Sequence, residues 1–409
     1  MERKPGVAVV FHHIGPYHHA RLNAAADRLS VIGIEWSAKG SDAWGIAATP
    51  ARYHKLSLFS EATEHDPSKA ELQEAFSSAL EQTKPDVVAV NGWNNFGSLT
   101  AAKCCVTSAI SMIVMSESSR QDGPRIWWKE FIKRRIVALH SAAVVGGQRH
   151  IEYLIELGMP RERIFTGYDV IDNEYFRRRA EEVRDQTSEI RQKYALPENY
   201  FLASARFIEK KNLSGLIKAY AEYRRVSEVR SQNSEISRNA VWDLVLLGDG
   251  ALKSDLCRLI SDLCLNGYVH LPGFKQYDEL PVYYALAKAF VHASTTEQWG
   301  LVVNEAIVSG LPVIVAERCG CVPELVRGNG FTFDSTNEHE LTGRLLEMAS
   351  LSDEERKKIG ENSYKIASQF GPELFGEGLE RAVRVAMRVR KRFGIMRRSL
   401  LLVTASCAR

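Results

Sequence analysis

The stretch from Ala289 to Ala316 constrains what this chain can fold into more than any other part. An apolar strand, AFVHAS, is followed by a loop, by a helical pattern that ends at Ser309-Gly310, and by a second apolar strand, PVIVA. Two short apolar strands joined by one helix predict a βαβ unit of a parallel sheet. The sequence therefore predicts an α/β fold.

The loop of this unit predicts an anion site. It places the backbone N–H groups of Gly300, Leu301 and Val302 at a helix N-terminus, where they lack intrahelical partners and the helix dipole adds partial positive charge. Glu297 precedes the helix and Glu305 lies inside it. Carboxylates accept hydrogen bonds and suit the vicinal hydroxyls of a sugar or a ribose. The alternative is that both are solvated acids at a helix start, which the dipole also favours.

Three segments around these acids carry a resemblance to a known family. They are EQWGLVVNEA, SGLPVI and GCVPELV, and their order and spacing resemble the E-x7-E signature of retaining GT-B glycosyltransferases of family 4, the glycosyl transferases group 1 type. The resemblance implies a GT-B fold, with two Rossmann-like α/β/α domains facing a central cleft. It also implies that Glu297 contacts the donor sugar and that Glu305 binds the ribose of the nucleotide.

Length and pattern predict two domains. The chain has 409 residues and two runs of alternating strands and helices. The charged segment 177–198 is predicted to be a linker helix. We expect an acceptor-binding domain over 1–185, a nucleotide-sugar-binding domain over 186–372, and over 373–409 a helix that returns to the first domain, followed by a tail. The expected strands lie near 6–11, 31–37, 53–59, 86–95, 109–119, 142–147, 163–172, 200–207, 243–251, 268–274, 289–294, 312–316 and 330–334.

Composition excludes several classes of protein. Hydrophobic residues make up 45% and charged residues 25% of the chain, as in an ordinary globular protein. A net charge of +3 gives no global field that would indicate nucleic-acid binding. Seven scattered cysteines form neither a zinc motif nor a disulfide framework, which favours a reducing cytosol. No apolar run approaches the ~18 residues of a transmembrane helix.

A basic motif, RFIEKKN, follows the first strand of the second run. Arginine offers a planar fork of donors and lysine a mobile point charge, so together they suit a diphosphate. The family resemblance assigns this role to Arg206 and Lys211, with Lys210 as the adjacent alternative. A basic helix start is disfavoured by the helix dipole, which is a further reason to expect a bound anion there.

The loop after the first strand contains a glycine and four histidines. Gly15 matches the family's glycine at the approach of donor and acceptor. His18 and His19, like the preceding pair His12 and His13, lack the helical spacing of metal ligands. We expect them to contact the acceptor or to pack within the loop.

Polar residues also follow the fourth and fifth expected strands. The carboxyl ends of parallel strands face the crevice where such sheets bind ligands, so Trp93, Asn94, Asn95, Glu117 and Asp122 are acceptor-site candidates. Each is equally consistent with a surface loop. Many family members have a histidine where this chain has Glu117, and we expect this carboxylate to act as a base or to position the acceptor.

Residues 127–140, WWKEFIKRRIVALH, combine aromatic and basic side chains. Such a helix can lie on an anionic membrane surface. The alternative is a domain helix with one core face and one solvated basic face.

Together these features predict a retaining glycosyltransferase of polysaccharide biosynthesis that moves a sugar from a nucleotide-sugar donor to a hydroxyl acceptor. The acceptor would be a glycan or a lipid-linked glycan. No D-x-D motif stands in the donor domain, so the expected enzyme needs no metal or other cofactor. It would be cytoplasmic, with peripheral contact to the inner face of the membrane. The rival hypotheses are a sugar-nucleotide epimerase and a non-catalytic nucleotide-sugar-binding protein.

Overall fold

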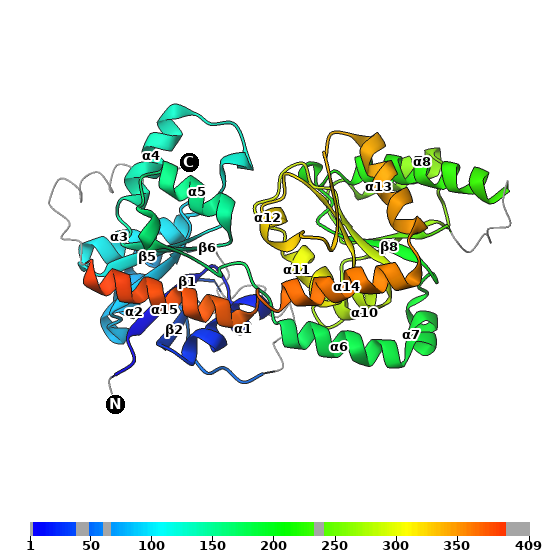
Figure 1. Cartoon of the computed structure of the whole chain (residues 1–409). Coiled ribbons are helices and arrows are strands. Elements are labelled where there is room, and N and C mark those ends of the chain that lie inside the picture. Colours follow the sequence, from blue (N-terminus) through cyan, green and yellow to red (C-terminus); the bar gives the residue numbers. More distant parts are fainter. Residues whose placement is uncertain (1–2, 38–48, 60–66, 233–240, 390–409) are drawn as a thin grey trace. The chain divides into compact units, whose positions relative to one another are not determined.

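The computed structural model describes residues 3–37, 49–59, 67–232 and 241–389, without the side chains of residues 230–232. The chain divides into two compact units (Figure 1). The first comprises the described residues of Met1–Asp172 and of Phe370–Arg409, and the second is Asn173–Gln369. The expected tail after residue 390 lies outside the described residues.

The first unit is built on a seven-stranded sheet in the order β3-β2-β1-β4-β5-β6-β7. Every pairing in it is parallel. The strands are β1 (Gly6–Phe11), β2 (Ser30–Glu35), β3 (His54–Ser57), β4 (Val87–Asn91), β5 (Ser111–Ser116), β6 (Ala142–Val145) and β7 (Ile164–Thr166).

Helices cover both faces of this sheet. They are α1 (Pro16–Ala26), α2 (Lys69–Thr83), α3 (Phe96–Thr107), α4 (Trp127–Val137), α5 (Gln148–Glu156) and α15 (Pro372–Arg388), with 3-10 turns at Arg120–Asp122 and Arg161–Arg163. Successive side chains of β1 enter different cores because strand residues alternate between faces. Val7 and Val9 pack with α1 and α15, whereas Ala8 and Val10 pack with α2 and α3.

Helix α15 belongs to the first unit although it follows the whole of the second in sequence. It contacts α1 and strands β4 to β7, and it is the red helix in Figure 1. Its apolar stripe, Phe375, Leu379, Val383 and Ala386, is buried in the core on that face of the sheet. The spacing of these residues is that of one helical face, so burial of the stripe explains why the helix docks there.

The second unit has a six-stranded parallel sheet in the order β10-β9-β8-β11-β12-β13. The strands are β8 (Tyr200–Ser204), β9 (Asp243–Leu247), β10 (Val269–Gly273), β11 (Ala289–His292), β12 (Val313–Ala316) and β13 (Gly330–Phe333). The helices are α6 (Asn173–Asp185), α7 (Thr187–Tyr194), α8 (Leu213–Gln232), α9 (Lys253–Asp262), α10 (Leu280–Leu286), α11 (Leu301–Val308), α12 (Val322–Leu325), α13 (Glu338–Ser350) and α14 (Asp353–Ala367), with a 3-10 turn at Glu209–Lys211.

The predicted α/β class is confirmed, and each expected strand is present near its expected place. Residues 177–198 form parts of two helices, α6 and α7, which both lie in the second unit. The expected domain boundary at residue 185 falls between these helices, whereas the two compact units divide after Asp172. In each sheet the strand order reverses beside the unit's first strand, between β1 and β4 and between β8 and β11. Ligands of doubly wound sheets bind at the carboxyl ends of the strands at such a switch point. No helix in the described part of the chain is long and apolar enough to span a bilayer.

Candidate functional site

Two loops meet at the switch point of the second unit. One follows β8 and carries Lys210 and Lys211, and the other follows β11 and carries Thr295 and Glu297. Their backbones are joined directly, because the N–H of Thr295 donates to the carbonyl oxygen of Lys210 at 2.9 Å. The sheet topology thus brings together two motifs that are 86 residues apart in sequence.

Glu297 is the centre of a polar cluster formed by these loops. Lys211 Nζ donates a short hydrogen bond to Glu297 Oε2. The same carboxylate oxygen lies 3.4 Å from His292 Nε2 and 3.4 Å from the hydroxyl of Ser294. The side chains of Lys211 and Glu297 are 11% and 12% exposed. The pair is therefore not an ordinary surface ion pair, yet it is not sealed from a ligand.

The electrostatics of this cluster keep Glu297 ionised. Burial alone would raise the pKa of Glu297, but the hydrogen bond and charge of His292, and then Lys211, together hold that pKa far below its usual range. Burial lowers the pKa of His292 itself, against the opposing effect of Glu297. Lys211 adds a second cationic side chain, which is hydrogen-bonded to the same carboxylate oxygen.

Gly300 sets the geometry of the loop that leads into α11. It adopts a φ of +104°, a left-handed conformation that costs other residues energy. A Cβ atom at this position would lie 3.4 Å from Glu297 Cγ and 3.5 Å from His292 Nε2. The first turn of α11 therefore starts directly beside the polar cluster. Leu301 and Val302 keep part of their surface exposed, whereas Val303–Val308 are buried.

Glu305 lies on the inner side of α11. It is buried, and it faces the hydroxyl of Tyr284 on α10. Burial first, and then the neighbouring Glu305 carboxylate, raise the pKa of Tyr284. The two acids of the signature therefore lie in different surroundings. Glu297 lies in the loop before α11 and is paired with Lys211, whereas Glu305 is buried within α11 beside the hydroxyl of Tyr284.

Arg206 extends from the loop after β8 into solvent. Its loop is braced by the turn at residues 248–250. The N–H of Phe207 donates to the carbonyl oxygen of Asp249 at 2.8 Å, and a Cβ atom at Gly248 would lie 1.9 Å from the carbonyl oxygen of Ala205. The Gly-Asp-Gly turn therefore supports the backbone that carries Arg206, which leaves the arginine side chain exposed to a ligand.

In the first unit, the loop after β1 is held by its own histidines. His18 Nδ1 accepts from the N–H of Gly15 at 3.3 Å, which caps α1, and the His18 ring packs on Phe11. Burial, with a smaller effect of Arg21, lowers the pKa of His18 well below its usual value. His19 contacts the hydroxyl of Tyr53 at 3.2 Å and the carbonyl oxygen of Thr49 at 2.9 Å. Both predicted acceptor contacts thus have local structural roles.

The loop after β4 contains three predicted acceptor-site residues, Trp93, Asn94 and Asn95, which differ in their exposure and in their contacts. Trp93 is 4% exposed and packs with Val114 and Leu154 in a core cluster. Asn95 is the N-cap of α3, where its side chain accepts from the N–H of Ser98 at 2.7 Å. Asn94, between them, is exposed. Asn94 therefore has the most surface to offer a ligand, and Trp93 has little.

Glu117 follows β5 and interacts with Asp169, a buried residue of the segment after β7. Burial, and then the Glu117 carboxylate, raise the pKa of Asp169 well above its usual value, whereas Arg21 opposes the shift. Arg21 is buried as well, and its Nε donates to the carbonyl oxygen of Val170 at 3.0 Å. The predicted base is therefore one member of an acid pair that lies next to a buried arginine.

Sequence reasoning missed several polar residues that complete these clusters. His292 and Ser294 were hidden in an apolar strand motif, and Asp169 in a segment predicted to be a strand, which ends at Thr166 in the structure. Polar residues at the carboxyl end of an apolar strand were the available signal, because this is the edge where ligands bind.

Within the described residues, no group of three or more histidine, cysteine, aspartate or glutamate side chains is arranged to hold a metal ion. No disulfide joins the cysteines in the described part of the chain, which are Cys104, Cys105, Cys257, Cys264, Cys319 and Cys321.

Residues 186–366 match the model of the family described as glycosyl transferases group 1. Over 194 residues the chain is 27% identical to the alpha-monoglucosyldiacylglycerol synthase of Streptococcus pneumoniae (strain ATCC BAA-255 / R6), which covers 47% of this chain and 41% of that protein. It is also 27% identical over 202 residues to the O-antigen chain mannosyltransferase B of Escherichia coli, covering 49% and 48%. The chain thus spans less than half the length of these curated relatives.

The likeness in structure extends over almost the whole chain. The crystal structure of Anabaena HepE in complex with UDP and glucose superimposes with a TM-score of 0.66 at 18% identity, covering 92% of this chain and 98% of that one. At this identity the match shows the fold, which is GT-B. Residues 186–366 thus match the glycosyl transferases group 1 family, and the chain has the GT-B fold of these solved structures.

Proposed function

We propose that this protein transfers a sugar from a nucleotide-sugar donor to a hydroxyl acceptor with retention of anomeric configuration. The observation that carries the proposal is the cluster at the switch point of the second unit. There Lys211, ionised Glu297 and the glycine at the start of α11 converge from two loops. A cation, a hydroxyl-binding carboxylate and a helix N-terminus are the groups that a sugar diphosphate requires.

The donor diphosphate would lie between the first turn of α11 and the basic loop after β8. Lys211, Arg206 and the N–H groups of Gly300, Leu301 and Val302 would stabilise the charge that develops on the leaving group. HepE binds UDP and glucose on the same fold, so a UDP-sugar is the donor that we propose. Deeper in the unit, Glu305 would hold the ribose, and the free carboxylate oxygen of Glu297 would orient the sugar.

The proposed reaction breaks the bond between the anomeric carbon and the β-phosphate oxygen and forms a bond to the acceptor oxygen on the same face of the sugar. The acceptor proton passes to the leaving diphosphate, as the family resemblance implies. In this scheme Lys211 is hydrogen-bonded to Glu297 before the donor binds, and it also interacts with the diphosphate once the donor is bound. No residue of the chain needs to form a covalent bond.

The acceptor would be a glycan or a lipid-linked glycan bound by the first unit. Among the relatives, one is a monoglucosyldiacylglycerol synthase and one is an O-antigen chain mannosyltransferase. The first name refers to a lipid, diacylglycerol, and the second to a polysaccharide, the O-antigen chain. Gly15, Asn94 and Glu117 are the residues that we propose for approach to the acceptor, with His18, His19 and Trp93 supporting the loops that carry them. We place the enzyme in the cytoplasm, with peripheral contact to the membrane.

A donor screen tests the proposal. The full chain is incubated with UDP-, GDP- and ADP-sugars, with and without diacylglycerol or oligosaccharide acceptors, and the products are identified by mass spectrometry. A glycosylated acceptor formed from a UDP-sugar is the expected result. An isomerised donor without acceptor product would instead show an epimerase. Donor binding without any turnover would show a non-catalytic binding protein.

A further inference from the structure

Helix α4 has an unusual outer face. Among the described residues, ten large hydrophobic side chains are exposed, and four of them lie within residues 126–131: Ile126, Trp127, Trp128 and Phe131. The most exposed of the four is Trp127, with 81% of its surface accessible to solvent. Isolated exposed apolar residues are normal, but a cluster of this kind marks an interaction site.

The cluster lies on one side of the helix. At 100° per residue, Trp127, Trp128, Phe131, Arg134 and Arg135 fall within an arc of roughly 120°. All five are exposed, whereas Ile136 and Val137 on the far side are buried. The outward stripe of α4 is thus aromatic in its first two turns and basic in its last. An ordinary surface helix has the reverse pattern, with its aromatic residues on the core side.

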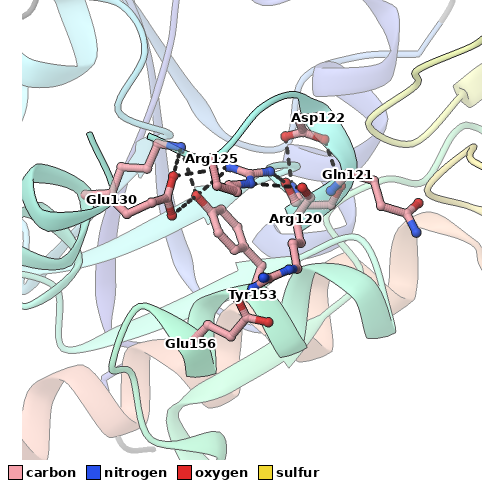
Figure 2. A network of polar contacts seen from close by, with 9 residues as sticks. Arg120, Gln121, Asp122, Arg125, Glu130, Tyr153 and Glu156 are labelled. Carbon is pink, nitrogen blue, oxygen red and sulfur yellow. Dashed lines mark hydrogen bonds and ion pairs between the residues drawn. The ribbon is translucent and has the colours of Figure 1, made fainter. Parts of the chain in front are cut away.

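The inner side of α4 is fixed by a polar network, which Figure 2 shows. The hydroxyl of Tyr153 on α5 donates to Glu130 at 2.8 Å and accepts from Arg125 at 2.9 Å and from Lys133 at 2.8 Å. Arg125 also donates to the carbonyl oxygens of Ser119 and Arg120. This network fixes the orientation of α4 against α5. The exposure of the aromatic stripe therefore follows from that orientation and not from loose packing of the helix.

The charge that faces outward is entirely positive. Glu130 is the only acid of α4, and it turns inward to Arg125 and Lys133. Burial would raise the pKa of Glu130, but these partners and Tyr153 lower it. Lys129, Arg134 and Arg135 have no ion-pair partner among the residues that the structure describes. The cation of Lys129 lies 5.4 Å from the ring of Trp128, and that of Arg135 lies 4.7 Å from the ring of Phe131.

We propose that the outward stripe of α4, formed by Trp127, Trp128, Phe131, Arg134 and Arg135 with Ile126 at the N-cap, docks the protein on an anionic lipid bilayer. Aromatic rings enter the boundary between headgroups and acyl chains, and flanking cations pair with lipid phosphates. A symmetric contact between two copies through the same face would bring two surfaces of like, positive charge together. Charge complementarity therefore favours an anionic surface over a second copy of the chain. This inference rests on the membrane contact proposed above and assigns it to a surface, and its test is independent of the transferase reaction because it needs no turnover.

The test is flotation of the full chain with vesicles of phosphatidylcholine alone and of phosphatidylcholine mixed with phosphatidylglycerol. The wild type is expected to float with the anionic vesicles only, with a blue shift of tryptophan emission. Arg134→Gln with Arg135→Gln removes two charges and should weaken binding about 30-fold, since each basic residue near such a surface contributes roughly 1 kcal/mol. Trp127→Ser with Trp128→Ser should abolish the blue shift and most of the binding.

Two control variants keep the test specific. Arg177→Gln with Arg178→Gln removes two exposed charges from α6, and Val229→Ser with Met387→Ser removes two exposed apolar side chains elsewhere. Both should float as the wild type does, and circular dichroism should show all variants folded. Absence of flotation by the wild type, or equal flotation by the α4 variants, would overturn the proposal. So would sedimentation data in which the α4 substitutions convert a dimer to a monomer.

Discussion

At the scale of single residues, the candidate donor site depends on the pair formed by Lys211 and Glu297. Each is the counter-ion of the other, in a setting that is largely withdrawn from water. Removing one partner of such a pair leaves an uncompensated charge, which costs more than the pair itself contributes. The pair therefore has two measurable consequences, one for stability and one for the binding of anions.

The first prediction concerns Glu297 and pH. The folded-state pKa of Glu297 lies below its ordinary value of 4.5. Its ionised form therefore stabilises the fold above about pH 4.5, and that contribution is lost as the pH falls toward the folded-state pKa. Glu297→Gln should lower the free energy of unfolding at pH 7 by about 2 kcal/mol, a value reduced from that of fully buried pairs because this pair is partly exposed.

Urea unfolding at pH 7 and at steps below pH 4.5 measures this effect. The difference between wild type and Glu297→Gln should shrink as the pH falls. Glu338→Gln, which alters an exposed ion pair with Lys218, should show little difference at any pH. A difference between wild type and Glu297→Gln that stays constant on acidification would contradict the assignment of a depressed pKa.

At the scale of elements, the start of α11 is the part of the donor site that depends on backbone geometry. Gly300→Ala places a methyl group at a φ of +104° and close to Glu297 and His292. We expect a loss of about 1–2 kcal/mol in stability and weaker binding of UDP, because the loop must shift. Gly343→Ala in α13 is the matched control, since a Cβ atom there meets nothing within 4 Å.

Calorimetry and UDP titration of both variants measure the two effects. Gly343→Ala should raise stability by about 0.5–1 kcal/mol, as expected for a helical glycine, and leave UDP binding unchanged. Wild-type stability and UDP affinity in Gly300→Ala would show that the left-handed turn is not needed for the site.

How far the sequence predicts these elements depends on the kind of signal. Most strands are short apolar runs, and such runs specify a parallel α/β sheet because buried strands need apolar side chains on both faces. The edge strand β3, HKLS, is the exception and is largely exposed. The E-x7-E segment places Glu297 and Gly300 together because they are three residues apart. The contact between Lys211 and Glu297 joins residues 86 positions apart, and only the family resemblance linked them.

Other contacts had no local signal. The packing of His19 on Tyr53 and the burial of Trp93 depend on tertiary packing, which spacing along the chain does not encode. The pairing of Glu117 with Asp169 joins the segments after two different strands, and Asp169 sits where the sequence predicted a continuing strand. In each case a neighbour that is distant in sequence sets the role of the residue, and the residue type alone does not indicate it.

At the scale of the whole molecule, the first unit is discontinuous. Its sheet is formed before residue 172, and its helix α15 arrives after the entire second unit. Leu379 of α15 and Leu345 of α13 are both fully buried, one in each unit. Leucine-to-alanine changes in such cores cost about 2–5 kcal/mol.

We therefore expect Leu379→Ala and Leu345→Ala to act on different units. Differential scanning calorimetry, combined with limited proteolysis read by mass spectrometry, should show earlier cleavage in the first unit for Leu379→Ala and in the second for Leu345→Ala. Identical cleavage patterns in both variants would contradict the division of the chain into these two units.

The most direct test of the whole account is the affinity of the full chain for UDP, measured by isothermal titration calorimetry. The wild type should bind UDP, and Lys211→Met should bind it about 10- to 100-fold more weakly, because a charge-assisted hydrogen bond contributes about 1.5–3 kcal/mol. Lys218→Met, which removes an exposed lysine of α8, should bind as the wild type does. If Lys211→Met and the wild type bind UDP equally, or if the wild type binds no nucleoside diphosphate, the donor site is not where this account places it.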